Sequence, residues 1–278
     1  MNILIATANN KSRNGAASLA RALSKNHKVT ICSMSSDHEY RGQAFSYVNK
    51  PIRVNKITSP KKPLTKGDND CGMENIAIFE FYSNPANAMS IMLGEIMRNR
   101  LPDIVICGVS NGTNMGPDVY SSSYVGMAME AGYFGRKAIV ISTEFEMGDL
   151  SDTSLKPVMQ FTENNIEKFA KAELPPHTFL NINIPKVDSY KKYKGVKFTE
   201  MGIMNSRLVF DEGVDPKGEK YYWSKVAKRE NIGDELDDKT WYDKGYISVT
   251  PISYDATDFE AIEGWDTLVK GISKRGAQ

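Results

Sequence analysis

The sequence has no long apolar run and no excess of charge of either sign. No segment of its 278 residues approaches the roughly 18 apolar residues that cross a bilayer, and the opening apolar run is too short for a secretory signal. Lys and Arg number 35 and Asp and Glu number 34, so no overall field attracts nucleic acid or an anionic membrane. These absences predict a cytoplasmic protein whose partners include neither nucleic acid nor membrane.

Cysteine and histidine are scarce. Cys32, Cys71 and Cys107 fit no metal-ligand spacing and cannot all pair. Cys32 and Cys107 stand within apolar runs, which predicts buried free thiols. The three histidines offer no catalytic pair, and only His38 lies on a loop that we expect near a site, where it could act as a general acid or base.

Several motifs of nucleotide binding and hydrolysis are also missing. The sequence contains no G-x-G-x-x-G, which argues against a dinucleotide site. It contains no G-x-x-x-x-G-K-[ST], which argues against a P-loop, and no G-x-S-x-G elbow of a serine hydrolase.

What is present is an alternation of strand-like and helix-like segments over residues 1–185. Expected strands start near Asn2, Lys28, Asp103, Lys137 and Phe179. Helical periodicity follows or separates them, at residues 15–23, 85–97, 125–132 and 157–172. This order predicts an α/β core with a Rossmann-like, doubly wound and mostly parallel sheet. A methionine stripe in the second of these helices is expected to pack in the core.

The pattern changes after Pro185. Residues 186–278 predict a mixed extension with hairpins that mediates oligomerisation, although the whole chain can also form one continuous domain. Strand-like segments cover residues 195–199, 221–223 and 245–251. Charged connecting segments cover residues 211–220 and 225–239, and a helix is expected at 258–272.

Ligands of an open parallel sheet bind beyond the carboxyl ends of its strands. Three segments qualify: the first loop (7–15), the second loop (34–46) and the third loop (108–124). The third loop is dense in Gly, Ser and Asn, whose small side chains let a backbone approach a phosphate or a sugar closely. A loop of this length in a compact domain is usually functional.

Residues 107–131 of this segment read CGVSNGTNMGPDVYSSSYVGMAMEA. This run resembles the SurE family of 5′/3′-nucleotidases, whose segment is roughly SGINxGxNxGxxxxYSGTVxAAxEG. Residues 180–185, 215–218 and 245–251 match further family motifs in the same order. The resemblance implies a Rossmann-like sheet, metal-dependent phosphomonoester hydrolysis, and a homodimer or homotetramer joined by the C-terminal extension.

The family's metal ligands are two adjacent Asp, a Ser and an Asn, and none of them is present. The corresponding positions hold Ala8, Asn9, Arg41 and Ser110. Magnesium and manganese prefer hard, anionic oxygen ligands, so we expect no metal bound in the family's way. A rebuilt site for Mg or Mn would need other carboxylates, for which the candidates are Asp37, Glu39, Asp118, Asp68 and Asp70.

The phosphate-proximal positions of the family motif are retained as Asn114, Gly116 and Ser122. Arg41, with Lys11 or Arg13, could neutralise an anion without metal, because a guanidinium holds phosphate or carboxylate through two donors. The predicted ligand-binding residues are therefore Asn9, Asn10, Arg41, Ser110, Asn111, Asn114, Gly116 and Ser122.

Three functions remain open at this point. The chain can bind, or act on, a nucleotide-like or other small anion without the usual metal. It can be an active 5′-nucleotidase with relocated metal ligands. It can also be a scaffold or regulatory subunit without activity. The sequence names no catalytic residue.

Overall fold

The structure is a computed structural model that describes residues 1–8, 13–47, 50–57, 76–144, 152–205, 208–226, 230–231, 236–262 and 265. Its centre is a sheet of nine described strands in the order β3-β4-β2-β1-β5-β6-β7-β13-β8. Their bounds are β1 Asn2–Thr7, β2 Lys28–Met34, β3 Val54–Ile57, β4 Ala77–Phe81, β5 Ile104–Asn111, β6 Ala138–Thr143, β7 Thr178–Ile184, β8 Val196–Phe198 and β13 Ile247–Ser253. The strands from β4 to β7 in this order are parallel, while β3 and β13 run antiparallel to β4 and β7.

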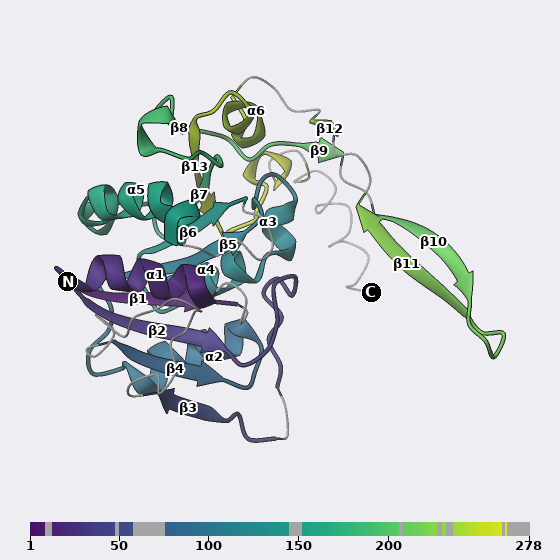
Figure 1. Ribbon diagram of the computed structural model, residues 1–278, viewed down its shortest axis with the longest axis horizontal. Coiled ribbons are helices and arrows are strands. Elements are labelled where there is room, and N and C mark those ends of the chain that lie inside the picture. The colour runs from purple at the N-terminus through teal and green to yellow at the C-terminus, as the bar shows by residue number, and fades with distance from the viewer. Residues whose placement is uncertain are drawn as a thin grey trace, which may run out of the picture.

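Helices cover both faces of this sheet (Figure 1). One face packs against α1 (Arg13–Ser24) and α5 (Asp152–Lys171), and the other against α2 (Pro85–Ile91) and α4 (Ser123–Tyr133). A strand covered on both sides buries every side chain, which explains why the central strands read as continuous apolar runs. The predicted α/β, mostly parallel fold is confirmed.

The predicted methionine stripe is part of the core. Met89 lies in α2 and Met92 in the π-helical turn Met92–Ile96 that continues it, and both side chains are fully buried. Cys32 and Cys107 are buried free thiols, as predicted, and burial raises the pKa of each well above its ordinary value.

The C-terminal extension adds strands to the main sheet and also forms a hairpin outside it. Two of its strands, β8 and β13, complete the sheet beside β7. Strands β10 (Leu208–Val214) and β11 (Lys220–Val226) form an antiparallel hairpin that projects far from the body of the molecule (Figure 1). The other described elements of this part are the helical turn Tyr190–Lys192, the short strands β9 (Met204–Asn205) and β12 (Glu230–Asn231), and helix α6 (Asp238–Asp243).

Four segments differ from the sequence-based expectation. The third loop is partly regular, because β5 continues to Asn111 and a short helix, α3, covers Asp118–Ser121. Helix α5 begins at Asp152 and contains Pro157, which we expected at its start. The charged segments 211–220 and 225–239 are not simple connections, since they hold parts of β10 and β11, β12 and the start of α6. The hairpin tolerates charged residues because nearly all of its described side chains are exposed.

Two expectations fall outside the described residues. They are the fate of Cys71 and most of the predicted helix 258–272. Within the described part of the chain, no helix combines the length and apolar character needed to cross a membrane.

Candidate functional site

The second and third loops are joined by backbone hydrogen bonds at the carboxyl end of the sheet. Gly42 N–H donates to Ser121 O over 2.8 Å, and Ser123 N–H donates to Glu39 O over 3.0 Å. Arg41 N–H donates to the hydroxyl of Ser123 over 3.0 Å. These bonds fix the backbone of Arg41 against the start of α4, while its side chain is exposed to solvent.

Two glycines make this contact possible. A Cβ at Gly126 would lie 2.4 Å from the carbonyl oxygen of Gly42, and a Cβ at Gly42 would lie 2.7 Å from the carbonyl oxygen of Tyr120. Gly42 also has a φ of +51°, which other residues rarely adopt. The second loop can therefore lie directly on α4 only because both positions lack a side chain.

The end of the first strand joins the same place. Ala8, whose side chain is fully buried, follows β1, and its carbonyl oxygen accepts a hydrogen bond of 3.1 Å from the N–H of His38. Thus Ala8, His38, Arg41 and Ser123 come together from the three predicted loops. Asn9, Asn10 and Lys11 lie outside the described residues.

His38 is partly buried at this junction. Its Nε2 lies 2.9 Å from the hydroxyl of Ser36, and its Nδ1 is buried without a hydrogen-bond partner among the described residues. Burial lowers the pKa of His38, the positive charge of Arg41 lowers it further, and Asp37 opposes both effects. The imidazole is therefore mostly neutral at pH 7 and able to accept a proton.

A hollow of about 490 Å³ opens beside His38, beyond the ends of β2 and β4. Its lining includes His38, Ser36, Lys50, Tyr82 and Asn84. The mixture of hydroxyl, amide and cationic groups with an exposed aromatic ring suits a polar ligand that also carries a ring.

The edge of this hollow is held by amides from the start of α2. Asn87 accepts a hydrogen bond from Ser46 N–H over 2.9 Å and donates one to Ser46 O over 3.1 Å. Asn84 donates to the hydroxyl of Ser46 over 2.7 Å. An amide offers both a donor and an acceptor, so Asn87 fastens the end of the second loop.

Asn114 lies inside the protein, where its backbone groups and its side-chain NH2 group have protein partners. Its side chain donates to the hydroxyl of Ser142 over 2.7 Å, and its N–H donates to Asn183 over 2.8 Å. Its carbonyl oxygen accepts hydrogen bonds from Asn181 and Asn183 on β7. The N–H of Gly116 donates to the carboxylate of Asp238 over 3.1 Å. Hydrogen bonds to β6, β7 and Asp238 thus fix this part of the third loop.

The remaining predicted residues stand at the ends of regular elements. Ser122 caps α4, its hydroxyl accepting a hydrogen bond of 3.4 Å from Val125 N–H. Ser110 and Asn111 end β5, in register with Ser142 and Thr143 of β6. Ser110 is buried and Asn111 is partly exposed.

Sequence reasoning missed the residues that support the third loop: Asn181, Asn183 and Asp238. One signal was available for the first two. Asn181 and Asn183 alternate with apolar residues in a strand, which directs both amides to one face of a buried sheet. Buried amides need partners, and the backbone of a polar loop supplies them.

The described residues at the family's metal positions do not fit a divalent metal. Ala8 presents a buried methyl group, Arg41 a positive charge and Ser110 a single neutral hydroxyl. In the described parts of the chain, no group of three or more His, Cys, Asp or Glu side chains is arranged to hold a metal ion. Asp68 and Asp70 lie outside those parts.

Comparisons with known proteins agree on one family. The family model described as "Survival protein SurE" matches residues 4–207. The protein named 5′-nucleotidase SurE from Thermoanaerobacter sp. strain X514 is 32% identical over 259 residues, which cover 92% of this chain and 94% of the relative. Its counterpart from Caldanaerobacter subterraneus subsp. tengcongensis is 34% identical over 216 residues, which cover 78% and 77%.

A solved structure supports the same conclusion at the level of fold. The crystal structure of the SurE protein from Aquifex aeolicus superimposes with a TM-score of 0.75 over 96% of this chain and 99% of that one, at 22% sequence identity. With a family model that spans most of the chain, and relatives above 30% identity over most of their length, the chain belongs to the SurE family.

Proposed function

We propose that this chain is a divergent SurE-family protein that binds, or acts on, a nucleotide-like anion without the metal that the family resemblance implies. The observation that carries the proposal is the meeting of Ala8, His38 and Arg41 at one junction. Where the family resemblance places a carboxylate and a serine hydroxyl as ligands of a cation, this chain has the methyl group of Ala8 and the guanidinium of Arg41. Arginine can neutralise a phosphate by itself through paired donors.

The ligand class follows from the surroundings of this junction. Relatives named 5′-nucleotidase suggest a nucleoside monophosphate. The hollow next to His38 has room for a nucleoside, and Lys50 adds a second positive charge at its rim. In our proposal the phosphate lies at Arg41 and His38, and the nucleoside extends into the hollow towards Tyr82.

Binding and hydrolysis can be tested separately. The full-length protein, purified and treated with EDTA, is titrated with nucleoside 5′-monophosphates and with sulfate in a calorimeter. Phosphate release is measured with and without manganese. We expect binding in EDTA that manganese does not improve. Manganese-dependent release of phosphate would favour an active nucleotidase with relocated ligands, and absence of anion binding would favour a scaffold or regulatory subunit.

We also infer that the chain self-associates through its C-terminal extension. The β10–β11 hairpin exposes apolar side chains on both strands, among them Phe210, Val214, Tyr222 and Trp223, the last of which is 67% exposed. A projecting hairpin with such side chains is typical of a surface that is covered by a partner. A second copy of the chain is the proposed occupant, in a homodimer or homotetramer.

Light scattering at several protein concentrations tests this inference. Replacing Phe210 and Trp223 together by Ser is expected to lower the mass of the assembly, while the α/β core stays folded by circular dichroism. A monomeric parent protein, or a double variant with unchanged mass, would contradict the inference.

A further inference from the structure

The carboxylate of Asp238 is fully buried, although it comes from the C-terminal extension and lies next to the third loop. One oxygen accepts a hydrogen bond from Gly116 N–H and the other from Gly202 N–H, each over 3.1 Å. The N–H of Lys239 is a third donor. No described lysine or arginine pairs with it, and the three backbone donors offset only part of the cost of burying its charge.

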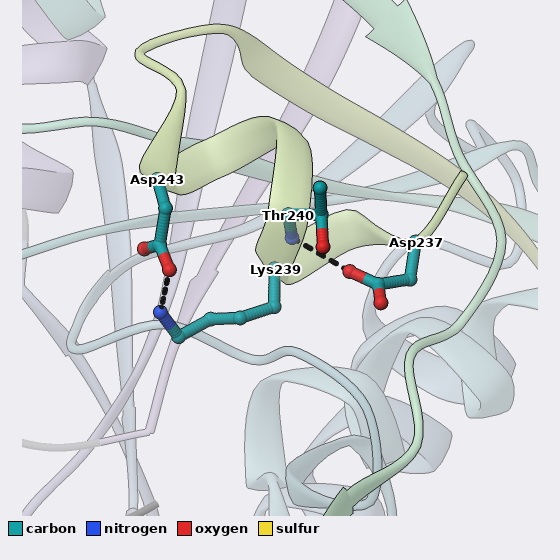
Figure 2. A network of polar contacts seen from close by, with 4 residues as sticks. All are labelled: Asp237, Lys239, Thr240 and Asp243. Carbon is teal, nitrogen blue, oxygen red and sulfur yellow. Dashed lines mark hydrogen bonds and ion pairs between the residues drawn. The ribbon is translucent and has the colours of Figure 1, made fainter. Parts of the chain in front are cut away.

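The carboxylate of the neighbouring residue, Asp237, makes a different contact. Asp237, also buried, is the N-cap of α6, and its side chain accepts a hydrogen bond of 2.6 Å from Thr240 N–H. Figure 2 shows this bond at the start of the helix, with the Lys239–Asp243 ion pair farther along. Asp237 thus caps its own helix, whereas the side chain of Asp238 bonds to the backbone of Gly116 and Gly202, outside the helix.

Further hydrogen bonds connect Gly116 to the place where the second and third loops meet. The carbonyl oxygen of Gly116 accepts a hydrogen bond of 3.2 Å from Val119 N–H in α3. At the other end of α3, the carbonyl oxygen of Ser121 accepts the bond from Gly42, next to Arg41. A continuous series of short backbone segments and hydrogen bonds therefore links Asp238 to the backbone that carries Arg41.

We propose that Asp238 is a positioning residue of the ligand site: its buried carboxylate holds the third loop in the conformation against which the Arg41 segment docks. This proposal rests on the proposed function. It makes the C-terminal extension a support of the binding site through the backbone of the third loop. An amide at this position would turn an N–H donor towards one of the backbone N–H groups, which releases either Gly116 or Gly202.

The test compares Asp238→Asn with Asp237→Asn, a matched control in the same turn. Affinity for a nucleoside 5′-monophosphate and for sulfate is measured by calorimetry in EDTA, and stability by urea unfolding. Hydrogen exchange of peptides covering residues 114–122 is followed by mass spectrometry. We expect Asp238→Asn to weaken binding at least tenfold and to speed exchange in these peptides, whereas Asp237→Asn changes affinity less than twofold.

Equal losses of affinity in both variants, in proportion to lost stability, would overturn the proposal, as would unchanged affinity in Asp238→Asn. If Asp238→Asn does not fold, Gly202→Ala replaces it, because its Cβ would lie 2.9 Å from the Asp238 carboxylate and displace it. If the parent protein binds no anion, the proposed function fails, and exchange alone decides: faster exchange supports the role of Asp238, and unchanged exchange refutes it.

Discussion

Replacing Arg41 by Ala tests the proposed site most directly. The guanidinium is exposed, while the backbone of the residue is fixed by the Ser123 hydroxyl and by the bond from Gly42 to Ser121. The substitution therefore removes a charge without removing the contacts between the loops. Any change in anion affinity can then be assigned to the side chain.

The size of the effect follows from the exposure of the side chain. Two unit charges 4 Å apart attract by about 1 kcal/mol in bulk water and by about 4 kcal/mol at an effective dielectric constant near 20. The attraction of an exposed arginine such as Arg41 lies between these limits, closer to the value in water. We expect a loss of about 1.4 kcal/mol, which is about tenfold in affinity, and a smaller loss in high salt because screening weakens exposed charges.

Calorimetry with sulfate and a nucleoside monophosphate measures this loss. Arg100→Ala is the control, since Arg100 is also exposed but precedes β5, at the opposite end of the parallel strands. Arg41→Lys is expected to fall between the parent and the alanine variant. A second readout needs no ligand: without Arg41 the pKa of His38 should rise, which NMR titration detects. Small and equal effects of Arg41→Ala and Arg100→Ala on binding would refute the assignment.

Three further predictions follow from the packing and charge of the site. Gly126→Ala should destabilise the protein by about 1–3 kcal/mol in urea unfolding, because its Cβ would overlap the carbonyl oxygen of Gly42; an unchanged midpoint would show that the loops separate at no cost. Burial raises the pKa of Asp238 to about 6 from an ordinary value of 3.8, so the folded state favours the protonated carboxyl group. The stability gained from this preference is complete below about pH 4 and is lost as the pH rises through 6. Relative to Asp238→Asn, the parent should therefore lose at most about 3 kcal/mol between pH 4 and pH 7, and parallel stability curves would contradict this. Ala8→Asp should cost at least about 2 kcal/mol because Ala8 is fully buried, and a rise in melting temperature with manganese would show that one restored carboxylate suffices for metal binding.

The sequence determined the α/β architecture because that architecture depends on local patterns. Apolar runs such as Ile3–Ala6 can be buried only in strands covered on both faces, and the helices between them carry one apolar face each. The family motif at 107–131 likewise identified the family that the comparisons show. The loss of the metal-ligand side chains could also be read directly, because the identity of a donor is a property of the residue itself.

The tertiary structure decided which polar groups remain available to a ligand. Asn114 and Gly116 match the phosphate-proximal motif, yet their backbone N–H groups donate to Asn183 and Asp238, and the side-chain NH2 group of Asn114 donates to Ser142. Asp238 lies 122 residues from Gly116 in the chain. Arg41 reaches the start of α4 through a bond that spans 82 residues. Such pairings depend on how strands and loops pack in three dimensions, and neither periodicity nor composition encodes them. Each buried polar group must find a partner wherever the fold provides one, and only the assembled structure shows where that is.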